Sequence, residues 1–311
     1  MDQILHKFIT VGGLKLHVAE IGSGPKTVIF LHGFPEVWYS WRHQMLAVSE
    51  AGFRAIAPDY RGYGLSEQPA DPEKTKFDDL VEDTVGVLDS YGVDKAFVVG
   101  KDFGVRVAYL LAKLHPERVE GVVTIGLPMA PLGPPTFHQT LPEGFYILRW
   151  QVPGRAEADF GRFDAKTVVR KIYISFAKSE IPIAAEDQEV MDLVDPSAPL
   201  PPWLTEDDME AYGALYEKSG FLTALQVPYR SLGEAFDITD PRVEAPALLI
   251  LGEKDYCLKF PGMEDYVNAG RVYHVVPNLE IVRLPEGCHF VQEQFPEMVN
   301  SHLISFLAGH V

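Results

Sequence analysis

The chain has 311 residues, enough for one large core with an insertion, and its 47% hydrophobic and 23% charged residues are typical of a globular protein. Its 27 basic and 44 acidic residues give a net charge of −17 without a basic cluster, which argues against nucleic acid or an anionic membrane as a partner. The start of the chain lacks an apolar signal core, and no apolar run reaches transmembrane length. Two cysteines form neither a disulfide framework nor a metal-ligand pattern, so we expect a cytoplasmic protein with reduced thiols.

The first part of the chain alternates short apolar runs with amphipathic stretches. Two glycines between the first two runs predict a hairpin. The expected strands are residues 8–11, 15–20, 27–31, 54–57, 96–99 and 121–125, and the expected helices are 38–49, 77–91 and 105–115. Buried strands that alternate with helices predict an α/β protein with a mainly parallel sheet and helices on both faces.

After Pro128 prolines become frequent, and strand signals disappear until Ala247. The stretches 165–179, 206–220 and 221–231 are expected to be helices, the second of them capped by Thr205 and Asp208. Strand signals resume at 247–252 and 280–284, which completes eight expected strands. We therefore predict a core made of 1–130 and 241–311 and a helical lid over 131–240. A second independent domain is the alternative.

The segment Gly100-Lys101-Asp102-Phe103-Gly104 lies between an expected strand and an expected helix. A sharp strand-to-helix turn with small residues two positions on either side of a central residue is the pattern of a nucleophile elbow, in which the central residue is usually serine. Here it is Asp102, a carboxylate. The alternative is an ordinary turn, with Asp102 at a helix N-terminus where its charge suits the helix dipole.

Two further polar residues follow the last two expected strands. Asp255 comes directly after the strand 247–252, and His289 follows the strand 280–284. The chain order is therefore nucleophile, acid, histidine, as in α/β-hydrolases. A lone histidine is more often a surface or packing residue, but this position after the last strand favours a catalytic role. Cys288 lies off the elbow and is interpreted as a packing residue.

Five motifs occur in one order along nearly the whole chain. They are His32-Gly33-Phe34-Pro35, the loop 59–66, Gln151-Val152-Pro153-Gly154, Val227-Pro228-Tyr229-Arg230 and the segment 287–293. With them the chain resembles the epoxide hydrolases of the α/β-hydrolase fold, most closely the plant soluble type. The resemblance implies an eight-stranded sheet with a helical lid. It also identifies Tyr146 and Tyr229 as the two lid tyrosines that face the substrate.

The chemistry that this resemblance implies fits the residue types. A carboxylate can attack a saturated epoxide carbon without first losing a proton, so Asp102 needs no base for this step. Tyr146 and Tyr229 bind the epoxide and supply a proton to the oxygen as the ring opens. His289, oriented by Asp255, then activates the water that hydrolyses the resulting ester.

The remaining implied features concern the oxyanion and the reaction's other participants. The backbone N–H groups of Phe34 and Phe103 are expected to bind the oxyanion of the second step, and both residues are expected to contact the substrate. The reaction joins a small apolar epoxide and a catalytic water to give a vicinal diol. No metal or cofactor is expected, and the chain is expected to act as a monomer or a homodimer.

Four residues depart from the family pattern. Lys101 precedes the nucleophile where many members have His, and Phe103 follows it where many have Trp. Val152 stands in place of Glu, and Cys288 in place of a small residue. None of these changes removes a catalytic group, so their expected effect is on the shape of the pocket and on substrate preference.

Two other functions are compatible with an aspartate nucleophile on this fold. A haloalkane dehalogenase also uses one, but it binds the leaving halide with ring or amide N–H donors, and the Phe103 side chain has none. A ligand-sensing receptor is the other alternative. Turnover of a simple aryl epoxide to a diol distinguishes the enzyme from the receptor. A fatty-acid epoxide and a terpenoid epoxide both fit the sequence.

Overall fold

The computed structural model of the protein describes residues 3–131, 137–195 and 197–310, so residues 132–136 and 196 of the predicted lid lie outside the described part. The chain forms an eight-stranded sheet in the order β1-β2-β4-β3-β5-β6-β7-β8. Only the β1–β2 and β2–β4 pairs are antiparallel. The strands are β1 Leu5–Val11, β2 Leu14–Ile21, β3 Thr27–Leu31, β4 Arg54–Pro58, β5 Ala96–Lys101, β6 Val119–Ile125, β7 Ala247–Gly252 and β8 Leu279–Leu284. The predicted fold class and mainly parallel sheet are confirmed.

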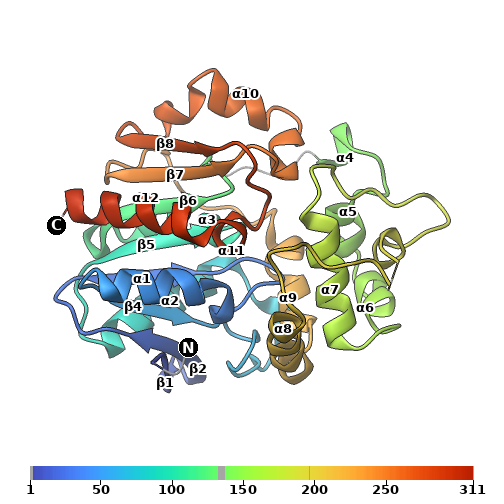
Figure 1. Ribbon diagram of the computed structural model, residues 1–311, viewed down its shortest axis with the longest axis horizontal. Helices are drawn as coiled ribbons and strands as arrows, with labels where there is room; N and C mark the ends of the chain where they lie inside the picture. The colour runs from blue at the N-terminus through green and yellow to red at the C-terminus, as the bar shows by residue number, and fades with distance from the viewer. Residues whose placement is uncertain (1–2, 132–136, 196, 311) are drawn as a thin grey trace.

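The central strands are buried along their whole length, which explains their continuous apolar sequences. Every residue of β3, β5 and β7 is buried, because helices cover both faces of the sheet. The helices α1 and α12 pack against each other on one face, and α2 packs against α3 on the other (Figure 1). The core helices are α1 Arg42–Glu50, α2 Phe77–Ser90, α3 Gly104–Leu114, α10 Met263–Asn268, α11 Val291–Gln294 and α12 Pro296–Gly309.

The helices between β6 and β7 gather beyond one end of the sheet, at the right of Figure 1. They are α4 Phe137–Thr140, α5 Tyr146–Gln151, α6 Arg155–Phe160, α7 Ala165–Phe176, α8 Glu206–Ser219 and α9 Leu222–Gln226. The described residues also form short 3₁₀ turns, which are η1 Trp38–Trp41, η2 Pro72–Lys74, η3 Pro116–Arg118, η4 Val190–Leu193, η5 Tyr229–Ser231, η6 Tyr256–Lys259 and η7 Arg271–His274. We use the word lid for the described part of the predicted lid, residues 137–195 and 197–240.

Two predicted lid helices show how local sequence decides where a helix begins and ends. The predicted cap of α8 forms: the Thr205 hydroxyl accepts a hydrogen bond from the Asp208 amide, and the Asp208 carboxylate accepts one from the Thr205 amide. The single helix predicted over 221–231 is wrong. It ends at Gln226, and Val227 is extended, because Pro228 disfavours helical geometry in the residue before it. Tyr229 therefore begins a separate 3₁₀ turn.

A buried polar network joins the lid to the core. Arg42 of α1 donates hydrogen bonds to Glu293 of α11 at 2.6 Å and to Asp208 of α8 at 2.9 Å. The hydroxyls of Tyr173 in α7 and Tyr212 in α8 also donate to Glu293, at 2.9 and 3.0 Å. We call these five residues the anchor network. Each charge in it faces a partner, which is the condition for burying charges at low cost.

Candidate active site

Asp102 occupies the sharp turn between β5 and α3, with a φ of 52°. A non-glycine residue rarely adopts this left-handed conformation, so the backbone is strained at the residue that the sequence singles out. The flanking glycine is needed because the elements crowd together. A Cβ on Gly104 would lie 2.2 Å from the Leu31 carbonyl oxygen. Small residues around Asp102 thus let the chain turn and present the carboxylate at the carboxyl end of the sheet.

The loop after β3 brings a backbone donor to the Asp102 carboxylate. The Phe34 amide donates to Asp102 Oδ1 at 3.1 Å, and the Phe103 amide also contacts this carboxylate and lowers its pKa. His32 fixes the loop: one of its ring nitrogens lies 2.8 Å from the Gly33 carbonyl oxygen and the other accepts from the Tyr60 amide. Burial lowers the pKa of His32 to about 4, so this ring is neutral and structural.

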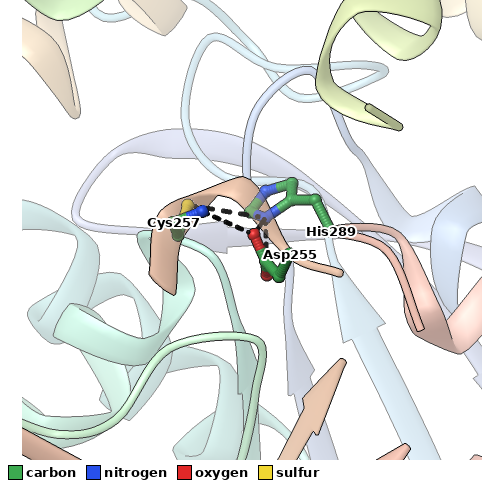
Figure 2. Close-up of side chains that lie close together, drawn as sticks. All are labelled: Asp255, Cys257 and His289. Atoms are coloured by element: carbon green, nitrogen blue, oxygen red, sulfur yellow. Dashed lines mark hydrogen bonds and ion pairs between the residues drawn. The ribbon is translucent and has the colours of Figure 1, made fainter. Parts of the chain in front are cut away.

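His289 and Asp255 meet at the same edge of the sheet. His289 Nδ1 lies 3.0 Å from both carboxylate oxygens of Asp255, and the Cys257 amide donates to Asp255 Oδ1 at 2.9 Å (Figure 2). His289 Nε2 points to Asp102 Oδ2 at 3.5 Å. That separation is longer than a hydrogen bond, so the two groups are close without being joined.

Neighbouring charges decide the protonation states of His289 and Asp102. Burial alone would lower the pKa of His289, but the carboxylates of Asp255 and Asp102 outweigh burial and the positive charge of Lys101, so the pKa lies well above its usual value. Burial alone would raise the pKa of Asp102, but His289 and Lys101 outweigh it and the pKa is lowered. At neutral pH Asp102 is therefore a carboxylate that faces the His289 imidazolium.

Among the residues that the structure describes, the one group of donors close enough to hold a metal ion is Asp255, Cys257 and His289, whose ligand atoms lie within 4.8 Å of one another. Their present contacts are those of a hydrogen-bonded pair with a thiol beside it. Burial raises the pKa of the Cys257 thiol to about 12, so the sulfur keeps its proton, whereas metal ligation uses the thiolate. His289 Nδ1 already faces both oxygens of Asp255. The donor set fits a catalytic acid–base pair better than a metal centre.

Lys101 is fully buried behind the nucleophile. Its ammonium nitrogen lies 3.9 Å from Glu36 Oε2 and 5.2 Å from the centre of the Phe290 ring. Burial lowers the pKa of Lys101, but the carboxylates around it, Glu36 first, outweigh burial and the pKa is raised. This departure from the family pattern therefore places a positive charge beside Asp102 and His289.

A cavity of about 300 Å³ opens onto the nucleophile. Its walls are largely apolar, and Asp102 lies in them together with both predicted tyrosines, Tyr146 from α5 and Tyr229 from η5. The two tyrosine rings are 6.2 Å apart. Burial, with the nearby negative charge of Asp102, raises both phenol pKa values well above the usual one, so both hydroxyls remain protonated at neutral pH.

The cavity also contains two residues that sequence reasoning missed. Tyr256 and Cys257 directly follow Asp255, and both line the cavity. The Tyr256 hydroxyl lies 3.1 Å from the Tyr146 hydroxyl. Their position after the acid at a strand's carboxyl end was a signal available in the sequence, because side chains there face the site in a parallel sheet.

No helix in the described ranges is long and apolar enough to cross a membrane. The model of the alpha/beta hydrolase fold family matches residues 26–296. Epoxide hydrolase 3 of Siraitia grosvenorii is 37% identical over 317 residues, covering 99% of both proteins. The structure is similar to the crystal structure of an epoxide hydrolase from Vigna radiata, with a TM-score of 0.91, 35% identity and 99% of each chain covered. It is also similar to potato epoxide hydrolase I, with a TM-score of 0.88, 34% identity and coverage of 98% of this chain and 99% of that one.

Proposed function

Because the chain belongs to the alpha/beta hydrolase fold family and, within it, to the epoxide hydrolases, we propose that it converts epoxides into vicinal diols through an ester on Asp102. The enzyme hydrolyses epoxides, and the geometry of the site supports the roles that we propose for its residues. The observation that carries them is the position of Asp102, which shares one apolar cavity with Tyr146 and Tyr229 and faces His289.

In the first step Asp102 attacks an epoxide carbon. Its lowered pKa keeps it ionised, so attack needs no base. The C–O bond of the ring breaks as the new C–O bond to Asp102 forms. Tyr146 and Tyr229 bind the ring oxygen, and one of them transfers its proton to the alkoxide that develops. Their raised pKa values ensure that this proton is present at neutral pH.

In the second step water attacks the ester carbonyl of Asp102. The oxygen that accepts from the Phe34 amide at 3.1 Å becomes the oxyanion, and the Phe103 amide is its second donor. The attacking water loses one proton to His289 Nε2, and Asp255 orients the imidazole through Nδ1. The oxyanion then collapses and the C–O bond between the Asp102 carbonyl carbon and the product breaks. The leaving alkoxide takes the remaining water proton from the new carboxyl group, which releases the diol and restores the Asp102 carboxylate.

Ester formation prepares His289 for this role. The free carboxylate of Asp102 is one of the charges that raise the pKa of His289, and the ester is neutral. The pKa of His289 therefore falls when the ester forms, and the imidazolium gives up a proton and becomes a base. The imidazolium proton is released as the tyrosinate takes up a proton, so the ester form contains a neutral imidazole and a neutral tyrosine. The nucleophile thus controls when its own base becomes active.

We also propose the extent of the lid, the cellular compartment and the oligomeric state. The predicted lid, 131–240, is proposed to close the cavity over a small apolar epoxide, because the cavity lining is largely apolar and Tyr146 and Tyr229 line it together with Asp102. Both cysteines are free and buried, which fits a reducing compartment such as the cytoplasm. We expect a monomer or a homodimer.

The variant His289→Gln tests the assignment of roles. It should still open the epoxide and then retain the substrate as an ester on Asp102, because a carboxylate needs no histidine to attack. Intact-protein mass spectrometry should show a gain equal to the whole epoxide, and peptide mapping should locate it on Asp102. The matched variant His289→Gln with Asp102→Asn should gain no mass.

Other outcomes identify other enzymes. A dehalogenase mixed with a haloalkane would retain the alkyl group without the halide. A hydrolase whose nucleophile needs histidine would form no adduct at all. A folded His289→Gln protein that gains no mass from an epoxide that the parent turns over would falsify the roles proposed for Asp102 and His289.

A further inference from the structure

Besides Tyr146 and Tyr229, the cavity is lined by Tyr256, a phenol to which the sequence analysis assigns no role. Tyr256 in η6 is 1% exposed and lines the cavity. Its hydroxyl lies 3.1 Å from the hydroxyl of Tyr146. Across the described ranges neither of these two hydroxyls has another hydrogen-bond partner in the protein. They form an isolated pair at the wall of the cavity.

Each phenol has a single proton, which limits what the pair can do when substrate binds. The epoxide oxygen only accepts hydrogen bonds. If Tyr146 donates to Tyr256, its proton points away from the substrate. If Tyr146 donates to the epoxide oxygen, its own oxygen is left to accept, and Tyr256 is the donor beside it. Substrate binding therefore selects the order Tyr256 to Tyr146 to epoxide.

We propose that Tyr256 is a positioning residue for Tyr146: by donating to the Tyr146 hydroxyl, it directs the Tyr146 proton to the epoxide oxygen and stabilises the phenolate that remains. This inference rests on the proposed role of Tyr146 as an acid. The step balances, because the Tyr146 proton passes to the alkoxide and the negative charge moves to the Tyr146 oxygen. Hydrogen bonds to a charged acceptor are stronger than those to a neutral one, so the contact strengthens during ring opening.

The surroundings of Tyr256 keep its hydroxyl in place. Its ring packs against Phe176 of the lid at 5.2 Å, against Phe260 at 5.8 Å and against the His289 ring at 5.1 Å, all measured between ring centres. The ring is thus fixed on three sides by aromatic neighbours. Burial raises the pKa of Tyr146 well above its usual value, and the hydrogen bond from Tyr256 opposes that increase. Tyr256 therefore makes Tyr146 a stronger acid than its burial alone would allow.

Tyr229 provides an internal contrast. Its ring lies 6.2 Å from that of Tyr146, almost the same distance as the 6.1 Å between Tyr146 and Tyr256. Yet its hydroxyl has no protein partner within the described part of the chain, although its backbone carbonyl accepts from Gln151. Tyr256 should therefore be coupled energetically to Tyr146 and not to Tyr229.

Two double-mutant cycles test this coupling, with the rate constant of ester formation measured in single turnovers at saturating styrene oxide. Tyr256→Phe keeps the ring and should slow ester formation roughly tenfold to 100-fold, as expected for a lost hydrogen bond to a developing charge. The dissociation constant of the epoxide should change less than about twofold. Adding Tyr256→Phe to Tyr146→Phe should cause no further slowing, whereas adding it to Tyr229→Phe should multiply the two effects.

A control variant removes a hydroxyl elsewhere. Tyr266→Phe loses a hydrogen bond to the Met129 carbonyl and should form the ester at the parental rate. Circular dichroism and the melting temperature verify that each variant is folded. A merely structural Tyr256 would lower the melting temperature and leave the rate constant of ester formation unchanged, which overturns the inference.

Further outcomes separate the two levels of the argument. If Tyr146→Phe forms the ester at the parental rate, the proposed role of Tyr146 fails, and this inference fails with it. If Tyr146→Phe is slow but Tyr256→Phe multiplies its effect, only the coupling is overturned. Slowing confined to ester hydrolysis would instead connect Tyr256 to His289 and would also overturn the inference.

Discussion

The two halves of the active site are held in different ways. The sheet half consists of Asp102, Asp255 and His289, each at the carboxyl end of a strand, and backbone amides hold both carboxylates. The lid half consists of Tyr146 and Tyr229, whose rings are set among other aromatic rings. The charged groups thus lie at the strand ends of the sheet, and the two neutral phenols lie on the lid. The comparison suggests that changes in the sheet half should abolish steps and changes in the lid half should slow one.

The largest effect is expected from the nucleophile. Asp102→Asn removes the attacking carboxylate but keeps the shape and the tolerance of a left-handed backbone. Turnover should fall by roughly 10⁴–10⁶-fold, as for other nucleophiles that act within a catalytic unit. Steady-state diol formation measures this, and the absence of a protein adduct verifies it. Residual turnover near the parental rate would mean that another group attacks the epoxide.

The corresponding change in the lid half should be smaller. Tyr229→Phe should slow ester formation by about 10²–10⁴-fold, because a general acid is lost while the nucleophile remains. Tyr146→Phe should slow the same step, and the double variant should be slower than either. Single-turnover kinetics measures the step directly. An unchanged rate in Tyr229→Phe would remove this tyrosine from the mechanism and leave Tyr146 as the sole acid.

The anchor network should decide how firmly the two halves are joined. Glu293→Gln leaves Arg42 buried with Asp208 as its remaining carboxylate, so the free energy of unfolding should fall by about 3–5 kcal/mol. The matched control is Glu206→Gln, which breaks the more exposed pair with Arg170 between α7 and α8 and should cost no more than about 1 kcal/mol. Denaturant titration compares the two variants. Equal losses would show that burial of the network does not matter.

The pH dependence should separate the two steps. The raised pKa of His289 means that this residue is protonated at and above neutral pH in the free enzyme, and ester hydrolysis requires the neutral imidazole. Hydrolysis should therefore slow by up to about tenfold per pH unit as the pH falls through the pKa of His289 in the ester form. Ester formation should stay constant over that range, because the lowered pKa of Asp102 keeps it ionised.

Rapid mixing over a series of pH values resolves the two phases. In the variant Asp102→Asn, which resembles the neutral ester, the pKa of His289 measured by NMR should be lower than in the parent. If both phases weakened together on acidification, or if the pKa of His289 did not move in Asp102→Asn, the proposed timing of the base would be contradicted.

The smallest effect is expected at Phe103, whose proposed role belongs to its backbone. The ring lines the cavity and packs against Tyr60 and Tyr63. Phe103→Trp should retain hydrolysis and change the ratio of kcat/KM between bulky and small epoxides by about tenfold. Complete loss of turnover in a folded Phe103→Trp protein would show that the side chain matters more than its amide.

The sequence predicts the sheet half better than the lid half for a physical reason. Strand ends follow from local patterns, and parallel strands bring their carboxyl ends together, so Asp102, Asp255 and His289 could be placed near one another in advance. Tyr146 and Tyr229 could be singled out only by resemblance, because a tyrosine that reacts and one that packs have the same local sequence. The roles of all five residues await the experiments above.

Other features depend on contacts that no local pattern encodes. The Tyr146–Tyr256 pair joins residues 110 positions apart, and Arg42 meets Glu293 across 251 positions. No periodicity or motif in the sequence indicates either of these contacts. The end of α9, in contrast, has a local signal. Pro228 disfavours helical geometry in the residue before it, and this effect divides the helix predicted over 221–231.

The strand β8 lies at the edge of the sheet with β7 beside it, and this position has a consequence for thermal inactivation of the enzyme. These two strands carry Asp255 and His289, whereas Asp102 lies at the centre on β5, and β8 is the more exposed of the pair. Edge elements open locally before a protein unfolds as a whole. A heat-stressed molecule that loses this edge would keep its nucleophile and lose its base. Each such molecule would consume one epoxide and remain esterified, so substrate would accelerate thermal inactivation and leave a covalent record of it on Asp102.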